Sequence, residues 1–170
     1  MKRSAAIIVI LIIILTITLF VSLNLNKEYI EKQKEILANA QIVLADDENK
    51  RVITIEDIIL YSGDFEAVLD TSTTEPATHI YTGVQLKELL NKNNIDFQNK
   101  IIIIKAADGY SVAYSSEEVS IDKNVYIAFM EEGKYLGGRD SGGRGPYESI
   151  VVSDTFSNRR CKWITEIEVK

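Results

Sequence analysis

The fold is decided by one stretch of the sequence, Ile101-Ile102-Ile103-Ile104-Lys105-Ala106-Ala107-Asp108-Gly109-Tyr110-Ser111-Val112-Ala113-Tyr114. Four consecutive isoleucines are typical of a β-strand that is buried on both faces. The Asp-Gly pair between this run and Tyr110–Tyr114 is the strongest short-range signal for a β-hairpin. The stretch therefore predicts two antiparallel strands joined by a tight turn, the first of them inside the core.

Short helices are predicted on both sides of this hairpin. Thr54-Ile55-Glu56-Asp57 has the pattern of a capping box, in which the first and fourth side chains satisfy backbone groups at a helix start. A single helical turn follows Ser115, whose hydroxyl suits an N-cap. Thr82-Gly83 opens an amphipathic helix that Asn93-Asn94 closes. Its inward positions are Val84, Leu86, Leu89 and Leu90.

Further strands are predicted from alternating or continuous apolar residues. They are expected at Glu66–Thr73, Asn124–Met130, Tyr147–Ser153 and Trp163–Val169, and a hairpin is suggested between Gln41–Ala45 and Arg51–Thr54. Strands outnumber helices. The predicted fold class is therefore α+β, a mixed β-sheet domain with short helices.

An apolar segment without charges precedes this domain, from Ala5 to Val21. A helix from Ala5 to Leu23 is roughly 28 Å long, which matches the hydrocarbon core of a bilayer. Lys2 and Arg3 before it favour a cytoplasmic N-terminus. A cleaved signal peptide is the alternative, but such peptides have a shorter apolar region that ends at small residues.

These features predict a single-pass protein of the cell membrane. Residues 1–23 form the membrane anchor, residues 24–45 a partly helical stalk, and residues 46–170 an extracytoplasmic domain. The net charge of −6 disfavours nucleic acid as a partner, because its phosphates require a basic surface. One cysteine cannot form an internal disulfide, so the domain depends on its apolar core.

Two basic segments stand out in this acidic chain. The loop Gly137–Pro146 contains five of the nine glycines together with Arg139 and Arg144, a composition suited to anion binding through backbone N–H groups and guanidinium forks. It does not match a P-loop. Arg159–Lys162 is the second segment. If the two converge, they form an anion site; if they do not, they are a flexible connection and solvated surface charge.

His79 and Cys161 are each the only residue of their type. A lone histidine without further ligands predicts a partly exposed loop residue rather than a zinc or catalytic site. Cys161 lies between Arg160 and Lys162, and neighbouring cations increase thiol reactivity. A buried structural cysteine is nevertheless the favoured interpretation.

The order of several motifs resembles the oxidoreductase molybdopterin-binding domain, the central domain of the sulfite oxidase family. The motifs are Tyr81–Leu90, Ala107–Val112, Val125–Met130 with Gly133, Gly142–Tyr147 before Ile150–Val152, and Cys161–Val169 with its Lys-Trp pair. In that family a cysteine upstream of the Thr-Gly-Val helix binds molybdenum. The corresponding stretch here, Val68–Ile80, has no cysteine, and Cys161 lies in the terminal strand instead.

The resemblance implies molybdopterin as a cofactor and places Arg160 and Lys162 loosely at the family's pterin-phosphate contacts. Without a thiolate ligand, however, molybdenum chemistry is in doubt. The favoured prediction is a non-catalytic module that binds a small anionic ligand or a membrane protein partner. Its expected contact residues are Asp108, Tyr110, Arg139, Arg144, Arg160 and Lys162. The alternatives are a molybdopterin-dependent oxidoreductase with an atypical or shared cofactor site, and a structural surface module.

Overall fold

A computed structural model describes residues 2–47, 49–71 and 74–170. Residue 1 of the predicted anchor and residues 72–73 of the predicted strand Glu66–Thr73 lie outside these ranges. The chain forms two compact units, Met1–Glu35 and Ile36–Lys170, and each is described by itself.

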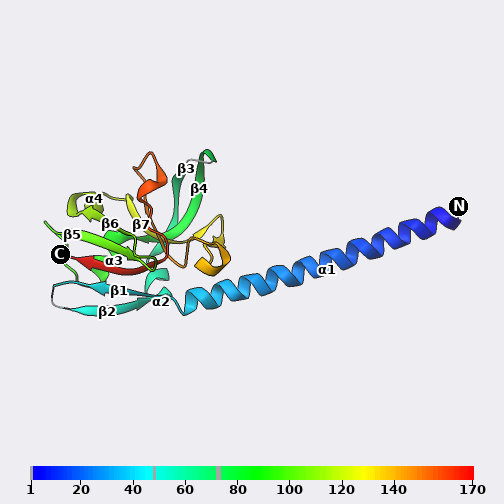
Figure 1. The fold of residues 1–170 in the computed structure, drawn as a ribbon, viewed down its shortest axis with the longest axis horizontal. Helices are drawn as coiled ribbons and strands as arrows, with labels where there is room; N and C mark the ends of the chain where they lie inside the picture. Colours follow the sequence, from blue (N-terminus) through cyan, green and yellow to red (C-terminus); the bar gives the residue numbers. More distant parts are fainter. Residues whose placement is uncertain (1, 48, 72–73) are drawn as a thin grey trace. The chain divides into compact units, whose positions relative to one another are not determined.

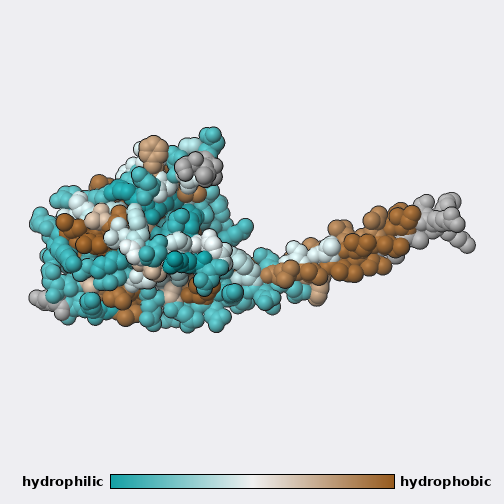
Figure 2. Space-filling model, in the orientation of Figure 1, coloured by the Kyte–Doolittle hydropathy of each residue, from teal (hydrophilic) through white to brown (hydrophobic). Residues whose placement is uncertain are grey.

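Helix α1 (Lys2–Ala38) forms the first unit as far as Glu35. Its last three residues belong to the second unit, which begins at Ile36. Within α1, Ile10–Ala38 is long and apolar enough to cross a membrane by length and composition. A signal sequence near an N-terminus has the same properties. Figure 2 shows apolar residues along much of this helix, where the sequence predicts the anchor. The helix continues through residues 24–38, so the predicted stalk is helical over this part.

Two β-sheets build the second unit (Figure 1). The first sheet has the strand order β2-β1-β10-β5-β6. Its strands are β1 (Gln41–Ala45), β2 (Lys50–Thr54), β5 (Ile101–Ala106), β6 (Ser111–Ser115) and β10 (Ile164–Val169). Neighbours in this sheet are antiparallel except β1 and β10, which are parallel. Because β1 lies inside the sheet, the compact unit begins before residue 46, where the sequence placed the domain boundary.

The second sheet has the order β3-β4-β7-β8, and β9 pairs with β7. Its strands are β3 (Ser62–Thr71), β4 (Thr74–Gln85), β7 (Val125–Glu131), β8 (Lys134–Tyr135) and β9 (Glu148–Val151). In Figure 1, β3 and β4 run side by side as a long hairpin. Short helices connect the strands: α2 (Ile55–Ile59), α3 (Leu86–Lys92), α4 (Ser116–Ser120), η1 (Arg139–Ser141) and η2 (Ser157–Arg159).

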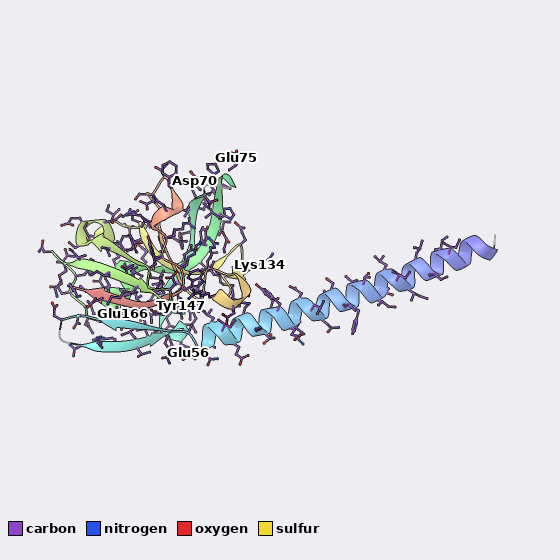
Figure 3. All side chains as sticks on the ribbon, viewed as in Figure 1. Glu56, Asp70, Glu75, Lys134, Tyr147 and Glu166 are labelled. Carbon is purple, nitrogen blue, oxygen red and sulfur yellow. The ribbon has the colours of Figure 1, made fainter. Side chains whose placement is uncertain are left out.

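One apolar core joins the two sheets. It combines Ile42, Ile104 and Ile167 of the first sheet with Ile127 and Phe129 of the second. Tyr147 is fully buried in the same core, and Figure 3 shows it within the domain. The mixed α+β architecture with two sheets agrees with the predicted fold class.

The central hairpin is confirmed, but its burial differs from the prediction. β5 and β6 pair around the Asp108-Gly109 turn, and Ile102 and Ile104 are fully buried. Ile101, by contrast, is 54% exposed. The prediction that β5 is buried on both faces was wrong, because its outer face carries Lys105, which forms ion pairs with Glu166 and Glu168.

The predicted capping box is present, with Asp57 accepting from the Thr54 backbone N–H at 2.8 Å. Ser115 accepts from the Glu118 N–H at the start of α4, as expected. The helix predicted from Thr82 begins only at Leu86, because Thr82 and Gly83 belong to β4.

Gly83 permits an unusually close approach of two strands. A Cβ atom added there would lie 2.4 Å from the Ile127 carbonyl oxygen, where β4 crosses β7 at an irregular register. Backbone atoms cannot move aside as a flexible side chain does. The glycine that suggested a helix start is therefore required by strand packing.

We expect Gly83→Ala to destabilise the protein by about 1–3 kcal/mol, because the added methyl group overlaps the β7 backbone. Chemical unfolding measures this change. Gly63→Ala is the matched control: Gly63 pairs with Gly83 across the β3–β4 hairpin, and a Cβ there meets nothing within 4 Å. Equal effects of the two substitutions would contradict the packing argument.

Candidate functional site

A groove of about 310 Å³ brings four of the six predicted contact residues together. It lies between the β5–β6 turn and the segment 157–163 that leads into β10. Its lining residues are Asp108, Tyr110, Ser157, Asn158, Arg160, Lys162 and Trp163. Four of the expected contact residues, Asp108, Tyr110, Arg160 and Lys162, therefore lie around one groove.

The β5–β6 turn positions the first wall of the groove. Gly109 has φ +89°, a conformation that favours glycine. Asp108 Oδ1 accepts from the Tyr110 N–H at 3.0 Å, and the Tyr110 carbonyl accepts from the Ala106 N–H at 2.9 Å. The Tyr110 hydroxyl donates to the Asn158 carbonyl at 3.5 Å, so it reaches the opposite wall. The turn therefore holds a carboxylate and an aromatic ring in fixed positions.

The opposite wall is held by ion pairs. Arg159 binds Glu118 of α4 at 2.6 Å and also pairs with Asp154. Ser157 Oγ accepts from the Asp70 N–H at 3.0 Å. These contacts fasten η2 to both α4 and the outer edge of β3.

Trp163 adopts a backbone conformation that is rare for a large side chain. Its φ is +54°. Three hydrogen bonds fix it: its N–H donates to the Arg144 carbonyl at 3.2 Å, its indole N–H to the Gly143 carbonyl at 2.8 Å, and its carbonyl accepts from the Ala107 N–H at 3.0 Å. A strained backbone conformation persists only where contacts with the surrounding structure stabilise it, and such residues often lie at binding sites.

Arg139 does not line the groove but supports it. Its guanidinium carbon lies 5.1 Å from the centroid of the Trp163 ring, a cation–π contact. The Gly-rich loop, Gly137–Pro146, thus supports the groove by holding the Trp163 indole in place.

Arg160 and Lys162 differ in how far they are engaged. Arg160 donates to the Tyr81 hydroxyl at 2.9 Å and to the Val68 carbonyl at 2.8 Å, which fixes its guanidinium. Lys162 is exposed, and no ion pair joins it to any carboxylate of the described residues. The groove therefore combines one anchored cation with one free cation.

Arg144 lies in a buried ion cluster instead of the groove. It pairs with Glu131 and, at 3.2 Å, with Glu148, which is fully buried. Burial raises the pKa of the Glu148 carboxyl, and the Arg144 charge opposes this effect. Arg144 thus serves two internal carboxylates.

His79 and Tyr81 border the same cluster. His79 lies on β4 rather than in the predicted loop, with Nδ1 3.1 Å from Glu131 Oε1, and it is partly exposed as expected. Tyr81 is fully buried, and burial raises its pKa. Because Arg160 donates to Tyr81, the cluster and the groove share a common element.

Cys161 is fully buried, which confirms the structural interpretation. Its Sγ lies 3.9 Å from the carbonyl oxygens of Ile104 and Lys162, and burial raises its pKa to about 12. A cysteine binds a metal as an accessible thiolate, so this buried thiol does not fit the role of a molybdenum ligand. Within residues 2–47, 49–71 and 74–170, no three His, Cys, Asp or Glu side chains are grouped to hold a metal ion.

Sequence reasoning did not place Ser157, Asn158 or Trp163 in the site. Trp163 carried a usable signal, because the only tryptophan follows directly after the basic segment. Ser157 and Asn158 carried none, since polar residues before a strand are common in loops.

No family model matches the sequence, and no curated protein matches it. Among solved structures, the sulfane dehydrogenase SoxCD from Paracoccus pantotrophus is similar, with a TM-score of 0.63 and 19% sequence identity. The match covers 78% of this chain and 38% of that chain, so this protein corresponds to little more than a third of its length. The likeness shows a shared fold and supports the sulfite-oxidase-like architecture that the motifs suggested.

The buried carboxyl of Glu148 makes a testable contribution to stability. Because its pKa is raised in the folded state, its contribution is complete below the ordinary value of 4.5 and is lost as the pH rises through the raised pKa. We expect Glu148→Gln to flatten this dependence, so that the variant gains stability relative to wild type as the pH rises above the ordinary carboxyl pKa of 4.5. Chemical unfolding across this range measures it.

Glu75→Gln is the control, since Glu75 is exposed on β4, near the tip of the β3–β4 hairpin in Figure 3. A constant stability difference between Glu148→Gln and wild type at every pH would show that Glu148 does not titrate as described.

Proposed function

We propose that this protein is a membrane-anchored, non-catalytic binding module that holds a small anionic molecule in the groove between the β5–β6 turn and segment 157–163. Helix α1 serves as the anchor, and Lys2 and Arg3 orient the domain to the extracytoplasmic side. The sulfite-oxidase-like fold provides the scaffold.

The observation that carries this proposal is the composition of the groove. Arg160 and Lys162 meet there in a chain of net charge −6, next to the rings of Tyr110 and Trp163. Small-molecule sites typically combine apolar walls with a few fixed polar groups. Arg160 is held by two hydrogen bonds and Trp163 by three. Because these two side chains are already ordered, they lose little conformational entropy when a ligand binds.

The same residues argue against catalysis in the groove. Neither a histidine nor a cysteine lines it. Ser157, the one serine among the described residues that line it, donates to the Val68 carbonyl and accepts from the Asp70 N–H. An activated nucleophile needs an adjacent base, and this hydroxyl is committed to backbone groups.

The oxidoreductase alternative is favoured only by the positions of Arg160 and Lys162, which match pterin-phosphate contacts loosely. The buried Cys161 thiol does not support it. Stoichiometric molybdenum in the purified full-length chain would overturn the binding-module proposal.

Anchoring fits a module of modest affinity. A domain tethered to the membrane samples a small volume around its neighbours, which raises the effective concentration of any membrane partner or locally released ligand. A weak site therefore suffices.

We expect the full-length chain to remain in the membrane pellet after alkaline extraction, as an integral protein does. Protease added to the extracytoplasmic side should digest residues 36–170 and leave the apolar part of α1 protected. Release of the intact chain by alkali, or protection of the domain, would contradict the anchor or its orientation.

Anion binding can be followed through Trp163, the only tryptophan. In the full-length chain in maltoside detergent, we expect 3,3-dimethylbutanoate to change the Trp163 fluorescence with a Kd of about 1 mM or below. Lys162→Met should weaken binding about threefold, the value of one exposed charge contact.

Lys134→Met is the matched control, because Lys134 is an exposed lysine of β8 outside the groove. The absence of any saturable response in wild type, or equal weakening by both variants, would refute anion binding at this groove.

A further inference from the structure

We propose that the groove selects a small zwitterion, a molecule that carries both a carboxylate and an ammonium group. This inference rests on the proposed anion site and names its ligand class. It follows from three features of the groove: the separation of its charges, the location of its aromatic rings and its rigidity.

Two opposite charges face the groove without neutralising each other. Asp108 comes from the β5–β6 turn and Lys162 from the segment before β10, and both are exposed. No ion pair joins them, and neither pairs with another charged side chain of the described residues. An exposed ion pair contributes little to stability, so both groups remain available to a ligand. Their separation across one groove leaves a complementary site for a ligand with both charges.

The groove is also polarised from one wall to the other. Its basic side contains Arg160 and Lys162, and Arg139 stacks on the Trp163 ring 5.1 Å from the centroid. Its acidic side contains Asp108 and Tyr110. Among the described residues, no lysine or arginine lies over the Tyr110 ring, which is 43% exposed.

An acidic side chain beside a free aromatic ring is the chemistry that recognises ammonium groups. The carboxylate of the ligand is therefore expected at Arg160 and Lys162, and its ammonium group at Asp108 and Tyr110. A purely anionic ligand would leave Asp108 opposing it.

The acidic side is fixed before any ligand arrives. Asp108 Oδ1 accepts the Tyr110 N–H at 3.0 Å, which leaves the second carboxylate oxygen for a ligand. The Tyr110 hydroxyl lies 3.5 Å from the Asn158 carbonyl oxygen, so the ring extends toward the opposite wall. A volume of about 310 Å³ accommodates a small molecule and lies at the lower end of typical ligand sites.

Three probes of similar size separate the possibilities. Glycine betaine carries both charges, 3,3-dimethylbutanoate has the same shape with carbon in place of the charged nitrogen, and choline lacks the carboxylate. Each is titrated against the full-length chain in maltoside detergent, with Trp163 fluorescence as the readout. We expect betaine to bind at least about fivefold more tightly than its carbon analogue, and choline to bind most weakly.

Asp108→Asn should abolish the preference for betaine, because it removes the charge but keeps the oxygen that accepts the Tyr110 N–H. Asp96→Asn is a closely matched control: Asp96 Oδ1 accepts the Gln98 N–H at the same 3.0 Å, in an exposed turn outside the groove. This control should retain the preference.

Equal affinity of wild type for betaine and its carbon analogue would overturn the zwitterion inference and leave the anion site standing. If Asp96→Asn also lost the preference for betaine, that preference would depend on the overall charge of the protein and not on Asp108, and the inference would be overturned. No response to any probe would refute the anion site itself. Even if Asp108→Asn fails to fold, the affinities of wild type for betaine and its carbon analogue test whether the groove selects a zwitterion.

Discussion

The strained backbone of Trp163 is the point at which the parts of the site are joined. Through three hydrogen bonds, this residue connects the Gly-rich loop, the β5–β6 turn and the start of β10. These segments are far apart in the sequence, and their shared contacts with one residue add to the β5–β10 pairing that holds them in register. A left-handed conformation at a tryptophan costs on the order of 1–3 kcal/mol, which the surrounding contacts must offset.

Arg160 extends this arrangement into the interior. It lines the groove, and its guanidinium also reaches the hydroxyl of the buried Tyr81, over whose ring Arg144 lies. Arg144 in turn serves Glu131 and Glu148. The basic residues that look alike in the sequence therefore have different roles: Arg160 spans surface and interior, Arg144 balances internal carboxylates, and Arg139 supports an indole ring.

Local signals in the sequence predicted local structure well. The Asp108-Gly109 turn and the caps at Thr54 and Ser115 form as expected, because each depends on residues within a few positions. Features that depend on distant partners were not predictable in the same way. Gly83 belongs to a strand because of the β7 backbone opposite it, and Ile101 is exposed on the outer face of β5, which also carries Lys105. The charged residues that line the groove are visible in the sequence, but the distances between them are not.

The order β2-β1-β10-β5-β6 has a consequence for how the domain is assembled. Its central strand, β10, is also the last strand along the chain, and it joins the β1–β2 hairpin on one side to the β5–β6 hairpin on the other. Each hairpin can form as soon as it is synthesised, but the first sheet stays in two halves until β10 is available. Completion of the first sheet therefore has to wait until β10 is synthesised, and the contacts that close it have large sequence separations, which is typical of slower folding.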